Sequence, residues 1–356
     1  MTKVYLIRHA EAEGNIYRRA HGQFDGQIIG RGYAQIEQLK ARFLNERIDA
    51  VYSSDLSRTR TTAAAICGPR SLPLFETEGL REVNVGVWED TAWGDIRHDY
   101  PEMSELFGGD PERWNVDGSE AFADVQRRMT DSIADIARRH EGGVAAVFSH
   151  GFAIRAFLCA AMGVASSEAY KVPYCDNTAV SLLSYDNGKL TVDFHGDNSH
   201  LQSGSSTFAS QTWWREETER RSEDMRYLPY DEARDAELYD MCRIEAGGSI
   251  PSADIEYSAF LDDEPAGILT LSFSGGDDST GRICGILIKP GFRRRGFGVQ
   301  LIGQAVSECR RRRRENLLVE APAGSPSVTY FKNRGFDVTG EAGSFRCLEK
   351  NVRNWG

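Results

Sequence analysis

The sequence lacks paired cysteines, long apolar runs and an excess of positive charge. Its seven cysteines are an odd number, lie far apart and form no Cys-x-x-Cys pair, which argues against a disulfide framework and a zinc site. No stretch reaches the roughly 18 uninterrupted apolar residues of a membrane span. The first apolar run meets Arg8 and His9 too soon for a secretory signal. We therefore expect a cytoplasmic protein with reduced thiols, no metal and no membrane partner.

The charge balance gives no reason to expect nucleic acid as a partner. Asp and Glu number 53 against 42 Lys and Arg, so the formal net charge is −11, which disfavours nucleic acid and acidic lipid alike. The composition, 40% hydrophobic and 27% charged, is typical of a soluble globular protein. At roughly 150 residues per domain, the chain is long enough for two domains or one large one. A homodimer is compatible with these features.

A change of composition over residues 202–223 predicts a domain boundary. Small polar residues lead there into the acid-base mixed run 215–221, which indicates a linker followed by a short helix or a strap. Trp213 and Trp214 within this segment are expected to dock on a neighbouring domain. We predict a first domain, a linker and a second domain over residues 1–201, 202–223 and 224–350.

In the first domain, short apolar runs alternate with helical patterns. The strand-like runs are 3–7, 48–52 and 143–148, and the helical patterns are 32–43, 57–67 and 122–139. Strands that alternate with helices predict an α/β fold: a mainly parallel sheet covered on both faces, in three α/β/α layers.

Polar residues follow each of these strands at its carboxyl end. The first strand runs into Arg8 and His9, the second into a segment that reaches Arg58, and the third into His150 and Gly151. Ligands of open α/β sheets bind outside the carboxyl ends of the strands. We therefore expect two histidines and two arginines to converge in one crevice.

These residue types together favour phosphoryl chemistry. The guanidinium of arginine is a planar fork that pairs with phosphate oxygens. A neutral imidazole held among cations can attack phosphorus and form a covalent phosphohistidine. The leaving oxygen then needs a proton, which a carboxyl group with a raised pKa supplies. Glu82, in the segment 80–89, is the candidate.

Four motifs in fixed order resemble those of the histidine phosphatase (phosphoglycerate mutase-like) superfamily over about residues 1–201. They are Arg8-His9-Ala10-Glu11, the run Tyr52 to Thr59, Leu80-Arg81-Glu82 with Gly86 and Trp88-Glu89, and Ser149-His150-Gly151. The resemblance implies that His9 is the phosphorylated nucleophile and Glu82 the general acid and base. It further implies a phosphoryl pocket and a substrate-binding rim made by Arg8, Arg58, His150, Asn15, His21, Gly22 and Gly151.

The departures from the superfamily pattern are modest. Ala10 stands where glycine is usual, and Glu89-Asp90 replaces the common Glu-Gly pair. The chain lacks both the lid insertion of mutases and the Arg-His-Tyr-Gly that continues the acid segment in bisphosphoglycerate-dependent mutases. The resemblance therefore implies the phosphatase branch, with a small phosphorylated metabolite as substrate and water as acceptor. Phosphoglycerate mutase-type transfer stays open as the alternative.

The second domain shows a strand, a glycine-bearing turn and a helix start in succession. The expected elements are strands 226–229, 256–261, 266–274 and 282–288, with helices over 231–244 and from the turn at Gly296 to about residue 313. The unsatisfied amides and the dipole of such a helix start attract anions, and glycines allow close approach.

Arg293-x-x-Gly296-x-Gly298, with Tyr330-Phe331 and Gly335-Phe336, resembles the acyl-CoA loop of the GNAT N-acetyltransferases over about residues 224–350. The resemblance implies an α+β fold with a mixed sheet, acetyl-CoA as co-substrate, and a small amine or peptide as acetyl acceptor. Its implied cofactor-binding residues are Ile286, Leu287, Ile288, Arg293, Arg294, Arg295, Gly296, Phe297, Gly298 and Val299.

This half departs further from its family. The tyrosine that often protonates the departing thiolate falls on Phe331, and Tyr330 is expected to point elsewhere. Glu256 and Glu320 are candidate bases but are more readily explained as surface carboxylates, and the arginines 310–314 as a solvated helix end. The sequence thus predicts a bifunctional phosphatase and N-acetyltransferase. A phosphatase with a non-catalytic CoA-binding or interaction module is the alternative.

Overall fold

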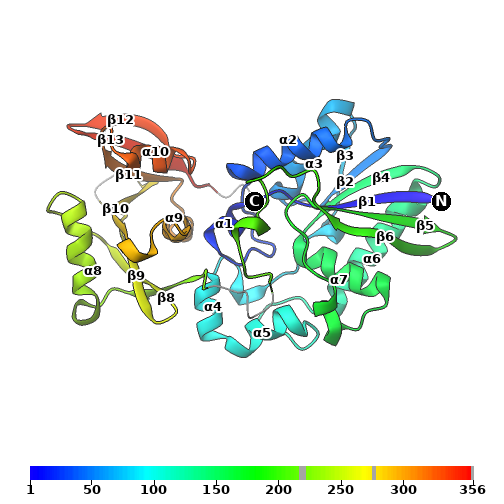
Figure 1. Cartoon of the computed structure of the whole chain (residues 1–356), viewed down its shortest axis with the longest axis horizontal. Helices are drawn as coiled ribbons and strands as arrows, with labels where there is room; N and C mark the ends of the chain where they lie inside the picture. The colour runs from blue at the N-terminus through cyan, green and yellow to red at the C-terminus, as the bar shows by residue number, and fades with distance from the viewer. Residues whose placement is uncertain (216–221, 275–277, 354–356) are drawn as a thin grey trace.

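The computed structural model describes residues 1–215, 222–274 and 278–353, which form two lobes with a sheet each (Figure 1). One sheet is built from strands within residues 2–197 and the other from strands within residues 225–351. The predicted acid-base run over 215–221 lies, beyond Arg215, outside the described residues. No helix of the described residues is long and apolar enough to cross a membrane. All seven cysteine thiols are free.

The first sheet has six strands in the order β3-β2-β4-β1-β5-β6. The first four of this order run parallel to one another, and β5 and β6 are antiparallel additions at one side. Arg8 at the end of β1 lies opposite Ser149 at the end of β4, so the residues that follow these two strands are neighbours. The strands are β1 (Thr2–Arg8), β2 (Ala50–Ser53), β3 (Leu74–Glu76), β4 (Val144–Ser149), β5 (Val180–Asp186) and β6 (Lys189–Asp197).

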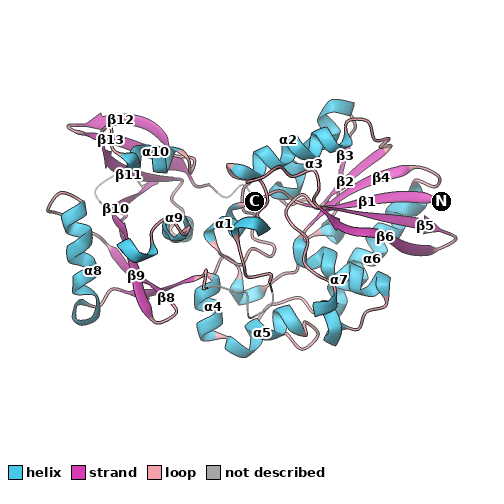
Figure 2. Cartoon of the chain, in the orientation of Figure 1, coloured by secondary structure: helices cyan, strands magenta, loops and turns pink. Residues whose placement is uncertain are grey.

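Helices cover both faces of this sheet, as the alternating pattern predicted (Figure 2). Leu6 packs into the core beneath α6 and α7, whereas its neighbour Ile7 packs into the core beneath α2 and α3, because successive strand residues face opposite sides. The three-layer α/β/α prediction is therefore confirmed. The helices are α1 (Glu13–Tyr17), α2 (Arg31–Phe43), α3 (Ser57–Arg70), α4 (Trp93–Asp99), α5 (Pro101–Gly109), α6 (Phe122–Arg139) and α7 (Gly151–Met162).

The second sheet is mixed, with seven strands in the order β12-β13-β11-β10-β9-β8-β7. Among the strands that the structure describes, only β10 and β11 pair in parallel, over residues 280–283 against 316–319. Beyond that point β10 and β11 continue without pairing to each other. The strands are β7 (Met225–Pro229), β8 (Ile255–Leu261), β9 (Glu264–Ser272), β10 (Thr280–Ile288), β11 (Asn316–Pro322), β12 (Asp337–Ala342) and β13 (Phe345–Asn351).

Within the described residues, three α-helices accompany this sheet: α8 (Glu232–Glu245), α9 (Phe297–Arg311) and α10 (Pro326–Lys332). Leu238 and Cys242 of α8 pack against one face of the sheet, and Leu301 and Ala305 of α9 pack against the other. Helix α9 lies between its own sheet and the first lobe, beside α1 (Figure 1). The predicted strands and helices of this lobe are confirmed, and the α+β fold with a mixed sheet is as expected.

The two lobes pack closely. A Cβ atom on Gly303 of α9 would lie 2.5 Å from the Cβ atom of Tyr17 in α1, and one on Gly94 of α4 would lie 2.3 Å from the carbonyl oxygen of Met225 in β7. Between these points the buried side chains of Arg18 and Asp224 form an ion pair at 2.5 Å. The interface therefore contains contacts so close that a side chain at either glycine would clash with the other domain.

The segment that leads from the first lobe to the second folds back over the first. Thr207 donates to the carboxylate of Glu11 at 3.0 Å. The ring of Trp213 lies 5.3 Å from that of Tyr174, and the ring of Trp214 stacks on Phe208 at 4.9 Å. The two tryptophans thus dock on the first lobe and on the segment itself.

Candidate active site

The ends of β1, β2 and β4 bring two histidines and two arginines together. The rings of His9 and His150 lie 5.3 Å apart, and Nε of Arg58 donates to Nδ1 of His150 at 3.1 Å. Arg8 follows the same strand end as His9, and all four side chains are buried. The strand-end argument therefore placed these four residues correctly.

His9 is held as a neutral imidazole with one nitrogen available. Its Nδ1 lies 2.7 Å from the carbonyl oxygen of Ala10; a carbonyl only accepts, so Nδ1 carries the proton and Nε2 keeps its lone pair. Burial, with the charges of Arg58 and Arg8, holds the pKa of His9 well below its usual 6.5. The ring therefore stays neutral and nucleophilic at neutral pH.

His150 carries its proton on the opposite nitrogen. Because Arg58 donates to Nδ1, the proton is on Nε2, which donates to Oγ of Ser54 at 3.0 Å. Burial and the charge of Arg58 hold the pKa of His150 well below 6.5. Sequence reasoning missed Ser54, although its place at the end of β2 was a usable signal.

Arg8 presents an unused donor at this site. Its Nη1 donates to the carbonyl oxygen of Cys175 at 2.5 Å, whereas its buried Nε has no hydrogen-bond partner among the described residues. A Cβ atom on Gly151 would lie 3.2 Å from this Nε, so glycine leaves the donor room. A buried, unpaired donor on a cation suits an anionic ligand.

A loop of the first lobe, residues 21–27, orients the guanidinium group of Arg58. Its Nη2 donates to the carbonyl oxygen of Gly22 at 2.6 Å and its Nη1 to that of Phe24 at 2.8 Å. Glu89 holds this loop in turn, because its carboxylate accepts from the amides of Gly22, Gln23 and Phe24 at 3.1, 2.7 and 2.9 Å. Gly22 therefore contributes its backbone, and a Cβ there would lie 2.3 Å from a carbonyl oxygen.

The carboxyl group of Glu82 lies at the first turn of α7. It accepts from the amides of Val83, Phe152 and Ala153 at 3.0, 3.0 and 2.8 Å. Burial raises the pKa of Glu82 above its usual 4.5, although these amides and Arg58 favour the charged form. Glu82 is thus a carboxyl group whose protonated form persists to higher pH than usual.

Two further predicted pocket residues, Asn15 and His21, lie in different surroundings. Asn15 lies beside the nucleophile, because its Oδ1 accepts from Nδ2 of Asn177 at 3.4 Å and the same Nδ2 donates to the carbonyl oxygen of His9 at 2.9 Å. His21, expected as a surface or loop residue and a rim contact, lies in a loop. Its side chain is only 5% exposed, and its Nε2 lies 3.1 Å from Asp90, so a surface position is wrong.

Comparison with known proteins agrees with this geometry. The family model described as the histidine phosphatase superfamily (branch 1) matches residues 4–198. The chain belongs to the histidine phosphatase superfamily. Relatives of this histidine phosphatase domain include phosphoserine phosphatase 1 of Hydrogenobacter thermophilus, 31% identical over 51% of this chain and 86% of the relative, and the metal-independent phosphoserine phosphatase of Arabidopsis thaliana, 30% identical over 57% and 84%.

A solved structure extends the comparison to the fold. YhfR of Bacillus stearothermophilus is 30% identical, with a TM-score of 0.55, and the alignment covers 57% of this chain and all of that protein. In the second lobe, residues 210–336 match the acetyltransferase (GNAT) family. The chain is therefore a histidine phosphatase domain fused to a GNAT domain.

The start of α9 forms a cradle of backbone amides in the GNAT domain. Gly296 precedes the helix with φ +90°, and Arg294 has φ +62°, so the turn depends on left-handed backbone. No acceptor contacts four of its amides within the described part of the chain: those of Arg294, Arg295, Phe297 and Gly298. The turn lies just beyond the end of β10, where β10 has separated from β11.

The predicted cofactor residues divide between the cradle and the core. Leu287 packs beneath α8, whereas Ile286 and Ile288 face the side of α9. Arg293 is tied to the turn by donating to the carbonyl oxygen of Ile288 at 2.8 Å. Unpaired amides among arginines fit the pyrophosphate of acetyl-CoA. No group of three or more metal-binding side chains occurs among the residues described.

Tyr330 points to the cradle, contrary to the sequence prediction. A Cβ atom on Gly298 would lie 2.5 Å from its hydroxyl oxygen, and Ile288 at the end of β10 lies next to the same glycine. Phe331, at the expected acid position, is buried in the core instead. The two residues belong to the short helix α10, whose rotation is set by packing and cannot be read from the motif.

Proposed function

We propose that the chain is a bifunctional enzyme, in which the first domain hydrolyses a small phosphomonoester through phospho-His9 and the second transfers an acetyl group from acetyl-CoA to an amine. The observation that carries the phosphatase proposal is a neutral His9 with a free Nε2 among cationic donors. Glu82, with its raised pKa, supplies the acid that the leaving group needs.

The reaction runs in two displacements at phosphorus. Arg8 and Arg58 donate to the phosphoryl oxygens, and the Nε2–H of His150 exchanges its Ser54 partner for one of them, while Nε2 of His9 attacks. The ester P–O bond breaks, and the leaving oxygen takes the proton of Glu82. Water then gives a proton to the Glu82 carboxylate and attacks phosphorus. The P–N bond breaks, inorganic phosphate leaves, and both side chains return to their starting states.

The two curated relatives carry phosphoserine phosphatase in their names. We therefore propose O-phosphoserine as the first substrate to test, because its alkyl leaving group requires the proton that Glu82 would supply.

The test of the phosphatase proposal compares His9→Ala with His98→Ala, which removes a half-exposed histidine of α4. Phosphate release from O-phosphoserine and from 4-nitrophenyl phosphate is measured, and alkaline quenching with labelled substrate traps the phosphohistidine. We expect His9→Ala to abolish release and labelling and His98→Ala to retain both. Full activity of His9→Ala would refute the proposal.

The acetyltransferase proposal rests on the cradle and on the end of the pairing between β10 and β11. Acetyl-CoA, when bound, supplies the activated acetyl group. The amides of residues 294–298 would hold its pyrophosphate, and the hydroxyl of Tyr330 lies beside them.

Calorimetry with acetyl-CoA tests this binding. Gly296→Glu places a carboxylate at the cradle and is expected to abolish binding, whereas Gly340→Glu, at an open position of β12, is expected to retain it. Absence of binding by the wild-type protein would refute the transferase proposal. Binding without transfer to any amine would identify a CoA-binding module.

A further inference from the structure

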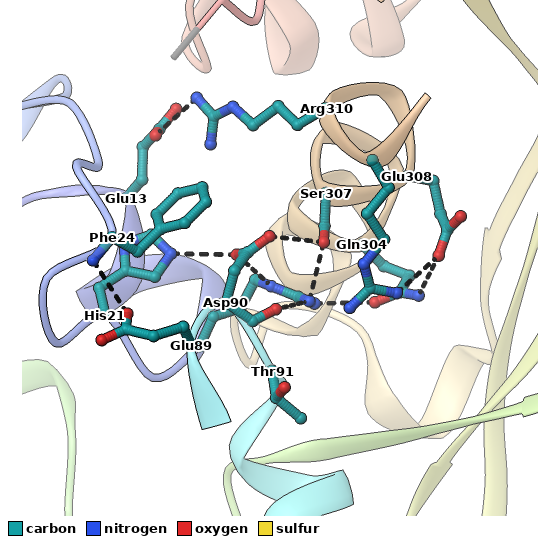
Figure 3. A network of polar contacts seen from close by, with 12 residues as sticks. Glu13, His21, Phe24, Glu89, Asp90, Thr91, Gln304, Ser307, Glu308 and Arg310 are labelled. Atoms are coloured by element: carbon teal, nitrogen blue, oxygen red, sulfur yellow. Dashed lines mark hydrogen bonds and ion pairs between the residues drawn. The ribbon is translucent and has the colours of Figure 1, made fainter. Parts of the chain in front are cut away.

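A buried polar network joins the two domains (Figure 3). Asp90 is its centre. Its Oδ1 accepts from Nε of Arg19 at 2.8 Å and contacts Nε2 of His21 at 3.1 Å, and its Oδ2 accepts from Oγ of Ser307 at 2.6 Å. Ser307 belongs to α9 of the GNAT domain. Arg19 also crosses the interface, donating to Oγ of Ser307 at 2.9 Å and to Gln304 at 2.8 Å.

The backbone at Asp90 is unusual for an aspartate. Its φ of +53° lies in the left-handed region that favours glycine, and the superfamily motif commonly has glycine there. Burial opposes the charge, yet Arg19 and the contact with His21 hold the pKa of Asp90 below its usual value. A charged side chain thus occupies a position where the backbone alone would favour glycine, and two of its partners, Arg19 and Ser307, form hydrogen bonds between the domains.

Helix α9 also contacts the far end of loop 21–27, the loop that orients Arg58. The guanidinium of Arg310 lies 5.6 Å from the ring centre of Phe24. Its Nη2 donates to Glu13 at 2.9 Å, and the same oxygen of Glu13 accepts from the amide of Gln27 at 3.2 Å. The side chain of Arg310 is only 8% exposed, so its prediction as part of a solvated helix end is wrong.

Loop 21–27 is therefore held between α9 on one side and Arg58 on the other. His21 at its start is fixed by Asp90, and Gly22 and Phe24 hold the two terminal nitrogens of Arg58. A shift of this loop turns the remaining N–H groups of Arg58 away from a phosphoryl oxygen. Misplacement of a binding group by about 1 Å can lower a rate about 100-fold.

We propose that Asp90 and Ser307 are positioning residues for the phosphatase reaction: through them α9 of the GNAT domain fixes loop 21–27 and thereby the direction of Arg58. This inference rests on the proposed phosphatase function. It makes the second domain a structural part of the phosphoryl pocket, although it supplies no atom that touches the substrate.

The test uses the full chain with Ser307→Ala, Asp90→Asn and Asp90→Gly. Two quantities are measured: kcat and KM for 4-nitrophenyl phosphate, and the Kd of orthovanadate, which occupies a phosphoryl pocket without turnover. We expect Ser307→Ala to lower kcat/KM about tenfold and to raise the vanadate Kd by a similar factor. Asp90→Gly relaxes the backbone but removes the contacts with Ser307, Arg19 and His21, so this variant should lose the most activity. Asp90→Asn keeps an acceptor for Arg19, so its activity should lie between that of Asp90→Gly and that of the wild type.

A double-mutant cycle and a matched control separate positioning from loss of stability. Because the effect of Ser307 on loop 21–27 passes through Asp90, Asp90→Gly combined with Ser307→Ala should have no lower kcat/KM than Asp90→Gly alone, although Arg19 also contacts Ser307. The control is Gln300→Met on the same helix, which removes hydrogen bonds to the backbone of Glu223 and Met225 rather than to Asp90 or the loop. It should lower the melting temperature and leave kcat/KM and the vanadate Kd unchanged.

The outcomes distinguish the two claims. If the wild type releases phosphate but Ser307→Ala matches it in both quantities, or if Gln300→Met loses as much activity, the positioning role is refuted and the phosphatase assignment stands. If the wild type hydrolyses neither 4-nitrophenyl phosphate nor O-phosphoserine, the phosphatase proposal fails, and the vanadate Kd of the variants decides the inference. Absence of vanadate binding by the wild type as well would overturn both.

Discussion

Replacement of Glu82 by glutamine should separate its chemical role from its structural one. The two side chains have nearly the same shape, but glutamine cannot donate a carboxylic proton to the leaving group. General acid-base catalysis contributes about 10²–10⁴-fold to a rate, so hydrolysis of O-phosphoserine should fall by that factor. The carboxylate also accepts from the amides of Phe152 and Ala153. Glutamine would present an NH2 group to one of these donors, at a cost of about 1–3 kcal/mol in stability.

The leaving group decides which step suffers most. Nitrophenolate departs without protonation, so the first displacement of 4-nitrophenyl phosphate should remain fast in Glu82→Gln. The second displacement still lacks its base. Stopped-flow absorbance should therefore show a burst of about one equivalent of nitrophenol, followed by slow turnover, with phosphate trapped on His9.

The pH profile gives an independent readout of the same residue. Glu82 must be protonated for the first step, and its pKa is raised, so kcat/KM for O-phosphoserine should fall as the pH rises through that pKa. The pKa of His9 is well below 6.5, so protonation of the nucleophile should limit the rate only at lower pH. In Glu82→Gln the fall at high pH should disappear. Equal losses on both substrates, without a burst and with an unchanged profile, would refute the acid-base assignment.

Three further substitutions test the geometry. Gly151→Ala adds a Cβ atom 3.2 Å from Nε of Arg8 and should weaken orthovanadate binding, measured by inhibition, while the melting temperature stays within a few degrees of the wild-type value. Asp224→Asn leaves the buried Arg18 without its charge partner and should lower the free energy of unfolding by about 3 kcal/mol in urea titration; an unchanged midpoint would contradict this. Tyr330→Phe should lower the rate of acetyl transfer while the calorimetric Kd of acetyl-CoA stays unchanged, whereas equal rates would exclude a role for the hydroxyl.

The sequence was most informative where local patterns determine structure. Short apolar runs located β1, β2 and β4, and the polar residues after them identified the crevice that holds His9 and His150. Parallel strands place their carboxyl ends at one edge, so convergence followed from the order of the elements alone. The turn before α9 was predictable for the same reason, because glycines and an arginine there follow an apolar strand.

The sequence was least informative where a contact joins distant parts of the chain. Asp90 and Ser307 are 217 residues apart, and no periodicity relates them. The one signal in the sequence was that Asp90 stands where the superfamily motif commonly has glycine. This marks the position as unusual but does not identify Ser307 as the partner of Asp90. The predictions for the orientation of Tyr330 and the exposure of Arg310 failed for a related reason. Both properties depend on how a helix packs against another element rather than on the residues of that helix alone.

The acidic net charge of the chain, −11, bears on how an anionic substrate is captured. At physiological ionic strength the Debye length is about 8 Å, so exposed carboxylates beyond that distance repel a phosphomonoester only weakly. Arg8 and Arg58 are buried, and burial strengthens their short-range attraction for a phosphoryl group as well as the cost of leaving them unpaired. The orientation of these guanidinium groups therefore matters more for phosphate binding than the net charge of the chain. A pocket of this kind depends on the loop and the helix that orient its guanidinium groups, which is why the network at Asp90 is placed to influence phosphate binding from outside the pocket.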